Sequence, residues 1–326
     1  MQLPIPGYNT SAEANVEGTG GVGGNRSGDA DVRGLLCDAH YAFGRESLAH
    51  SEMVEIAKGR ELAQRLESIE ASVSEACVEA VLGAQPDGGA TVQRIAGGLA
   101  FFFGPLSPLS QAVGIGMDGP VSEEEFDRLE GFFIARNAPI SISLCPYADP
   151  SALERLASRR YRITHFEHTL IRRLGGDESF LAPPQAIVRQ ARAGEERLWS
   201  GTVMEGFQEG LPAMEGLADL FALLFSAPGA TCYLAWQNGQ PAGGATLSIR
   251  KNAAMFYSDS TLPAFRHRGL HAALIAARLQ HASSAGCHLA VACTAPGSAS
   301  HRNYELAGFS VAYTKAILVR DTFTIS

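Results

Sequence analysis

Apolar positions in the first part of the chain recur with the period of a helix. Leu62, Leu66 and Ile69 are spaced by four and three residues, and Glu and Arg occupy the other face. Residues three and four apart share one helical face, so the pattern predicts helical structure from 32 to about 82. The elements expected after it are strands at 91–103, 111–117, 139–144 and 161–172, a helix opened by the capping box of Ser122 and Glu125, and a helix at 150–160.

Strands and helices also follow one another in the second half. The dipeptide Asn238-Gly239 separates two β-prone runs and predicts a tight hairpin. The expected strands span 187–189, 231–236, 241–250, 253–261, 287–293 and 311–319. The expected helices span 195–208, 215–226, 269–285 and 298–307. No block of residues in the second half is identical to a block in the first half. Any repetition is therefore in the order of strands and helices and not in the sequence.

Two stretches of small and polar residues divide the chain. Residues 1–30 are rich in Gly, Asn, Ser and Thr without an apolar period, which predicts a flexible tail. Residues 174–184 contain Gly and Pro pairs and are the best linker candidate. A length of 326 residues suits two domains. We therefore expect a tail at 1–30, a first domain at 31–175 and a second domain at 185–326.

Charge and cysteine usage exclude several classes of protein. A formal net charge of −8 argues against a nucleic-acid partner, which normally requires a basic patch. The six cysteines form no Cys-x-x-Cys pair and no cluster with zinc spacing, so we expect reduced thiols, a cytoplasmic location and no metal. The start of the chain lacks a basic stretch followed by an apolar one, and apolar runs such as 217–227 are too short to span a bilayer. The sequence thus predicts neither a secretory signal nor a membrane partner.

The stretch 258–279 joins a β-prone run to an apolar helix through a turn that contains Gly269. The first N–H groups of a helix have no partner within the helix, and the helix dipole adds partial positive charge there. Arg266 and Arg268 add full charges beside the turn. Backbone donors and arginines together favour an anion such as a pyrophosphate.

These residues resemble a motif of the GNAT superfamily of acyl-CoA-dependent N-acyltransferases. The family signature, Arg/Gln-x-x-Gly-x-Gly/Ala shortly after a proline, is matched by Pro263, Arg266 and Gly269, with His271 where the family prefers Gly or Ala. Downstream, the run from Tyr304 to Phe309 resembles the second family motif, Tyr-x-x-x-Gly-Phe. The two motifs stand in the expected order and at the expected distance.

The resemblance implies a fold and a cofactor. The fold is of the α+β class, with tandem GNAT folds similar in layout to mycothiol synthase-like proteins. Each fold is a mostly antiparallel sheet with a splayed parallel strand pair, flanked by helices. Residues 117–124 of the first half are acidic and would repel a pyrophosphate, so that half is expected to be degenerate and without cofactor. Acetyl-CoA is expected in the second half, on Thr261, Leu262, Arg266, His267, Arg268, Gly269, Leu270, His271, Ala272 and Asn303.

The resemblance also assigns catalytic residues. Tyr304 matches the family tyrosine that protonates the departing sulfur, and a phenol with a pKa of about 10 carries its proton at neutral pH. A core tyrosine at a helix end is the alternative. Many family members carry a glutamate base where this chain has Met255. Strand alternation puts Asp259 on the face of Tyr257, so Asp259 is the candidate base; an aspartate that binds turn N–H groups is the alternative.

Together these features predict an N-acyltransferase that moves an acetyl group from acetyl-CoA to a primary amine of a small molecule. The protein is expected to be a monomer or a homodimer. Two alternatives stay open. One is a non-catalytic acyl-CoA-binding or scaffolding protein, motivated by the missing glutamate at Met255 and by the bulk of His271. The other is a protein N-acetyltransferase. The identity of the acceptor and the length of the acyl chain are not encoded in any recognisable motif.

Overall fold

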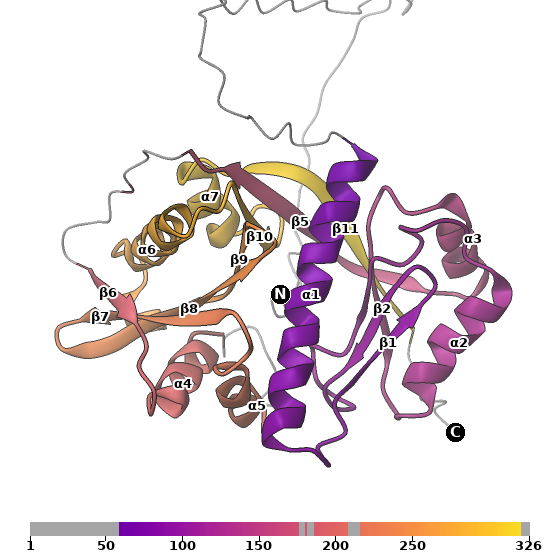
Figure 1. The fold of residues 1–326 in the computed structure, drawn as a ribbon, viewed down its shortest axis with the longest axis horizontal. Helices are drawn as coiled ribbons and strands as arrows, with labels where there is room; N and C mark the ends of the chain where they lie inside the picture. Colours follow the sequence, from indigo (N-terminus) through magenta and orange to yellow (C-terminus); the bar gives the residue numbers. More distant parts are fainter. Residues whose placement is uncertain (1–58, 176–179, 181–185, 208–215, 321–326) are drawn as a thin grey trace, which may run out of the picture. The chain divides into compact units, whose positions relative to one another are not determined.

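A computed structural model describes residues 59–175, 180, 186–207 and 216–320 (Figure 1). The helices are α1 Arg60–Ala84, α2 Glu123–Ile134, α3 Pro150–Ser158, α4 Glu196–Phe207, α5 Leu217–Leu224, α6 Leu270–Ser284 and α7 Ala299–Leu306. The strands are β1 Thr91–Ile95, β2 Gly98–Phe102, β3 Ala112–Val113, β4 Ile140–Leu144, β5 Arg162–Arg173, β6 Ile187–Gln190, β7 Ala230–Gln237, β8 Gln240–Arg250, β9 Ala253–Thr261, β10 Leu289–Thr294 and β11 Ser310–Arg320. The predicted tail and most of the predicted linker lie outside the described residues.

Elements of the first half follow the predicted order with two differences. The run 91–103 is a hairpin and not one strand, because Ala96 and Gly97 form a turn with φ of 52° and 75°. The strand expected over 111–117 is shortened to β3, since Gly114 and Gly116 adopt positive φ and end it. The predicted capping box is confirmed at the start of α2. There the Ser122 hydroxyl accepts from the Glu125 N–H, and the Glu125 carboxylate accepts from the Ser122 N–H.

The second half contains the elements that the sequence predicts. The hairpin between β7 and β8 turns at Asn238 and Gly239, both with positive φ, as the Asn-Gly dipeptide predicts. Strands β7, β8 and β9 form an antiparallel meander. The chain then passes through α6 to β10, which pairs with β9 in parallel. The predicted α+β class, with a mixed sheet flanked by helices, is confirmed.

Strands β5 and β11 cross between the two halves, so that the strands of the described residues form one 11-stranded sheet in the order β1-β2-β3-β4-β11-β5-β10-β9-β8-β7-β6. Strand β5, which follows α3, pairs with β10 of the second half. The last strand, β11, pairs with β4 of the first half and with β5. Figure 1 shows β5 and β11 running together between the two groups of helices, with α1 in front of the sheet. The predicted domain limits stay a prediction.

The apolar core also joins the halves. One cluster contains Cys77 and Val81 of α1 together with Phe221 of α5 and Leu234 of β7. Contacts of α1 extend to β8 and β9 of the second half. None of the described helices is long and apolar enough to cross a lipid bilayer.

Strands β5 and β11 each pair with a strand of the other half, so a fragment that contains only one half loses a strand neighbour. A fragment of residues 186–326 is expected to aggregate, because β10 loses its antiparallel neighbour β5 along Leu289–Thr294 and becomes an apolar edge strand. Light scattering of the purified fragment measures this. Co-expression with residues 1–185 should restore a soluble complex. A fragment that is monomeric and cooperatively folded by itself would contradict the prediction.

Candidate functional site

The site begins where β9 diverges from β10. Parallel pairing runs from Ala253 with Leu289 to Phe256 with Ala292, so the last five residues of β9 leave their neighbour. At the same place β9 bulges against β8, with Ser258 at a φ of 57°. The expected splay of a parallel strand pair is therefore present in the second half.

The bulge changes which side chains share a face. Phe256 and Asp259 both face Arg278 of α6, whose guanidinium lies 4.6 Å from the Phe256 ring centroid and pairs with the Asp259 carboxylate. Tyr257 lies on the other side, near Cys77 and Cys232. The sequence prediction that Asp259 shares a face with Tyr257 is wrong, because the extra residue of the bulge reverses the alternation.

A cavity of about 510 Å³ opens at this splay. Its walls come from the end of β9, from the turn before α6, from the first turn of α6 and from α7. Most of the predicted site residues line it: Asp259, Thr261, Arg266, His267, Gly269, Leu270, His271, Ala272 and Asn303. Leu262 lines a neighbouring cavity of about 620 Å³. Arg268 lies outside both, with its guanidinium 5.5 Å from the Phe265 ring centroid.

The turn before α6 presents backbone donors to this cavity. Gly269 is the N-cap of α6 at a φ of 77°, and no side chain caps the helix. The first N–H groups of α6 are thus open to a ligand, in contrast to α2, whose capping box and three glutamates fill the same place in the first half. Arg266 does not point freely into the cavity. Its guanidinium donates to the carbonyls of Thr261 and Gly206 and ties the turn to α4.

At the cavity wall, Asp259 is the centre of a buried hydrogen-bond network. Its carboxylate accepts from both terminal nitrogens of Arg278 and, at 2.8 Å, from the Tyr304 hydroxyl. Arg278 and Tyr304 are 0% and 1% exposed. The sequence analysis missed Arg278. A single arginine on the apolar face of a predicted helix was the available signal, because such a charge requires a buried partner.

The imidazole of His271 connects this network to the cavity. Its Nε2 lies 3.2 Å from Asp259 Oδ1 and its Nδ1 lies 2.9 Å from Asn303 Nδ2. A carboxylate only accepts and an amide nitrogen only donates, so Nε2 donates to Asp259 and Nδ1 accepts from Asn303. The side chain of His271, which replaces a small residue of the family motif, therefore bridges β9 and α7.

Burial and charge set the protonation of the network. Burial by itself would raise the pKa of Asp259, but the Arg278 guanidinium and the hydrogen bond from His271 outweigh it and hold that pKa well below its ordinary value. Burial raises the pKa of Tyr304 well above its ordinary value. Asp259 is thus an ionised carboxylate with weak basicity, and Tyr304 is a phenol that keeps its proton.

Breaking the central ion pair has a predictable effect on stability. Asp259→Asn leaves the Arg278 charge buried without a counter-ion, so the variant should lose about 3–5 kcal/mol of unfolding free energy. Chemical denaturation measures this loss. Arg266→Lys, at the partly exposed turn, is the matched control and should change stability by less than about 1 kcal/mol. An unchanged denaturation midpoint for Asp259→Asn would contradict the ion-pair assignment.

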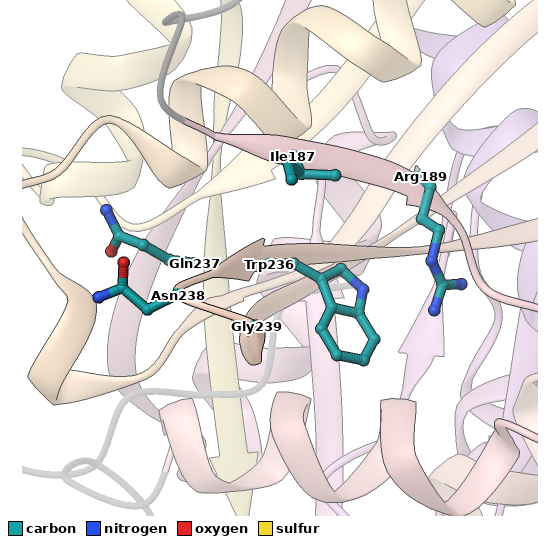
Figure 2. Close-up of a pocket in the computed structure, with 6 residues that line it drawn as sticks. All are labelled: Ile187, Arg189, Trp236, Gln237, Asn238 and Gly239. Carbon is teal, nitrogen blue, oxygen red and sulfur yellow. The ribbon is translucent and has the colours of Figure 1, made fainter.

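A second hollow lies at the sheet edge formed by β6 and the β7–β8 hairpin, and Figure 2 shows its lining. The Arg189 guanidinium stacks at 5.0 Å from the Trp236 ring centroid and forms two hydrogen bonds to Glu195. Gln237 and Asn238 point away from this pair in Figure 2. None of the residues predicted to bind a cofactor lines this hollow, so it is not the candidate site.

Comparisons with known proteins agree with this fold. The model of the Acetyltransferase (GNAT) family matches residues 198–309, which include the cavity. A search of curated proteins returned no match. Residues 198–309 therefore resemble the GNAT family, whose members use acetyl-CoA.

Three solved structures illustrate the likeness. A GCN5-related N-acetyltransferase from Kribbella flavida is 17% identical, with a TM-score of 0.56 over 77% of this chain and 95% of that one. One from Sphaerobacter thermophilus is 14% identical, with a TM-score of 0.52 over 72% and 76%. A tandem GNAT protein from the clavulanic acid biosynthesis pathway is 12% identical, with a TM-score of 0.52 over 81% and 95%. At these identities the likeness establishes the fold alone.

Proposed function

We propose that this protein transfers an acetyl group from acetyl-CoA to a primary amine of a small molecule. The observation that carries the proposal is the single cavity that joins the uncapped start of α6 to the splayed end of β9. A pyrophosphate suits the N–H groups of α6, and an extended pantetheine arm suits the backbone that β9 leaves unpaired beside β10.

The residues that hold acetyl-CoA are those that the sequence predicts. The pyrophosphate binds the turn from Arg266 to Ala272, with His267 and Arg268 exposed beside it. The pantetheine arm follows Thr261 and Leu262. Asn303 contacts the arm once its hydrogen bond to His271 is released. Because His271 bridges β9 and α7, its side chain must move or stack against the arm when the cofactor binds.

The reaction converts an ammonium and a thioester into an amide, a thiol and one released proton. The amine loses a proton and its nitrogen attacks the carbonyl carbon. The carbon–sulfur bond then breaks, and Tyr304 gives its proton to the sulfur and recovers one that the nitrogen loses. Asp259 positions Tyr304 and His271 and does not take the proton of the amine, because its pairing with Arg278 makes it a weak base.

The turnover test uses the full chain with acetyl-CoA and a panel of small primary amines. Release of free thiol above the rate of amine-free controls is the expected result, and mass spectrometry of the acetylated amine identifies the product. We expect a monomer or homodimer and a cytoplasmic location. Tight acetyl-CoA binding without turnover on any amine would contradict the proposal.

Non-catalytic acyl-CoA binding is the alternative that a specific observation favours. The Tyr304 hydroxyl is directed at Asp259, and His271 occupies the wall where the family motif has a small residue. Acetylation of a protein acceptor is a second alternative, and a lysine-containing peptide added to the amine panel distinguishes it.

A further inference from the structure

A group of buried acids lies on the opposite face of the sheet, under α1. Glu67 and Glu70 of α1 are 3% and 5% exposed, and the side chain of Glu167 on β5 is 13% exposed. The buried ammonium of Lys315 on β11 lies between them, 2.6 Å from Glu70 and 3.5 Å from Glu167. We call the group formed by these four side chains and by Thr169 the acid chamber.

The acid chamber lies at the vertex of the splay, which is the point where β9 and β10 begin to diverge. Cys293 is the first residue of β10 after the last pair with β9, and its Sγ lies 4.0 Å from Glu70. Cys293 is paired across the strands with Thr169, so the Thr169 side chain shares the α1 face. Asp259, His271 and Tyr304 lie on the other face, with α6 and α7. A thioester in the splay is therefore flanked by the cofactor cavity on one face and by the acid chamber on the other.

Carboxyl groups outnumber basic groups among the described side chains of the acid chamber. Three carboxyl groups face the one described ammonium there, and burial costs several kcal/mol for each ion without a partner. Tyr313 donates to Oε1 of Glu67, but Oε2 of Glu67 is buried without a hydrogen-bond partner among the described residues. The hydroxyl of Thr169, which is 1% exposed and cross-strand from Tyr313, also lacks a partner there. The described side chains of the chamber thus offer unpaired acceptors and more carboxyl groups than ammonium groups.

These features point to one class of ligand. An ammonium group carries three donors and a positive charge, which matches the unpaired acceptors and the surplus of carboxyl groups among the described side chains. A metal ion fits less well, because the Lys315 ammonium already lies against Glu70 and because burial raises the pKa of Cys293 and keeps its thiol protonated. The side chain of Glu167 is 13% exposed, so a primary amine at the end of an unbranched chain would approach the chamber there.

We propose that the acid chamber is the acceptor site and binds the ammonium of a primary alkylamine, with Glu67 and Thr169 as the residues that recognise it. This inference rests on the proposed acetyl transfer. The acid chamber would supply the amine to the thioester at the point where β9 and β10 diverge, from the face opposite the cofactor. The assignment makes Glu67 and Thr169 specificity residues of the reaction.

The groups that surround Glu67 predict a characteristic stability effect. They are Glu70 on α1, Glu167 on β5, Cys145 after β4, and Tyr313 and Lys315 on β11. Burial raises the pKa of Glu67 to about 7 against the opposing charge of Lys315. A carboxyl whose pKa is raised by folding loses stability as pH rises through that range. Glu67→Gln should therefore raise the melting temperature of the ligand-free protein, more at pH 8 than at pH 5.

The binding experiment uses the full chain and n-butylamine, which is an ammonium at pH 8, with 1-butanol as the uncharged control. Butylammonium should raise the melting temperature and 1-butanol should not. Calorimetry should show that Glu67→Gln weakens butylammonium binding roughly 30-fold or more, as expected for a lost buried charge partner. Thr169→Val should weaken it less, and acetyl-CoA affinity should stay unchanged in both variants.

Glu130→Gln is the matched control. Glu130 is also buried, but it pairs with Arg159 and Arg320 away from the chamber. This variant should lower the melting temperature and leave butylammonium affinity unchanged. Unchanged butylammonium affinity in Glu67→Gln would overturn the assignment of the chamber. A melting temperature raised by Mn²⁺ or Zn²⁺ but not by butylammonium would also overturn it and indicate a metal site.

The two proposals fail in different ways. Loss of butylammonium binding in Glu67→Gln, in a protein that binds no acetyl-CoA, would support the chamber and contradict acetyl transfer. Acetyl-CoA-dependent amine acetylation with unaltered KM for the amine in Glu67→Gln would contradict the chamber and support acetyl transfer.

Discussion

Replacing Gly269 by aspartate is expected to abolish acetyl-CoA binding and to leave the protein folded. Gly269 is the N-cap of α6 and lines the cavity at the point where the helix N–H groups are open. A carboxylate there would accept those N–H groups itself and would repel a pyrophosphate, which costs several kcal/mol at such close range. Calorimetry should show a Kd for acetyl-CoA raised roughly 100-fold or more.

The same substitution should not unfold the protein. Aspartate is a favourable N-cap residue and tolerates a φ of 77° better than most side chains do, so the melting temperature should change little. Gly269→Asn is the control, because asparagine has the same shape and no charge. It should weaken binding much less than aspartate. Equal affinity in the aspartate variant and the parent protein would show that the turn does not hold the pyrophosphate.

Removing the Tyr304 hydroxyl is expected to lower turnover by roughly 10²–10⁴-fold, the usual effect of a positioned general acid. Tyr304→Phe retains the ring, which packs edge-on at 4.9 Å from the Phe309 ring centroid. The hydroxyl acts as charge develops on the sulfur, so the affinity for acetyl-CoA should stay nearly constant. Steady-state kinetics with the best amine of the panel, together with calorimetry, separate the two effects.

The hydrogen bond from Tyr304 to Asp259 makes a stability control necessary. Loss of the hydroxyl removes one of several donors to Asp259, while the Arg278 ion pair remains, so stability should fall by about 1 kcal/mol. Asp259→Asn should lower both stability and turnover, because it releases Tyr304 and His271 together. Parent-level turnover in Tyr304→Phe would mean that the tyrosine only packs against the core.

The sequence predicted the local elements of this fold well. The helical spacing of α1, the capping box of α2 and the Asn-Gly turn of β7 and β8 depend on neighbouring residues, and the structure confirms each of them. The turn with Arg266 and Gly269 was recognisable for the same reason, because its geometry is set within a few residues. The sequence predicted one strand over 91–103 where the structure has a hairpin, because Ala96, the first residue of the turn, is not a typical turn residue.

The sequence by itself determined the order of the elements and the position of the turn before α6, because these depend on periodicity and on short motifs. The class of fold followed from the resemblance to the GNAT family. Only the tertiary structure decided the exchange of β5 and β11, the pairing of Asp259 with Arg278 and the acid chamber under α1. Those features join residues far apart in the chain, such as Glu67 and Tyr313. Their energies come from burial and charge compensation, which a linear pattern of residues does not specify.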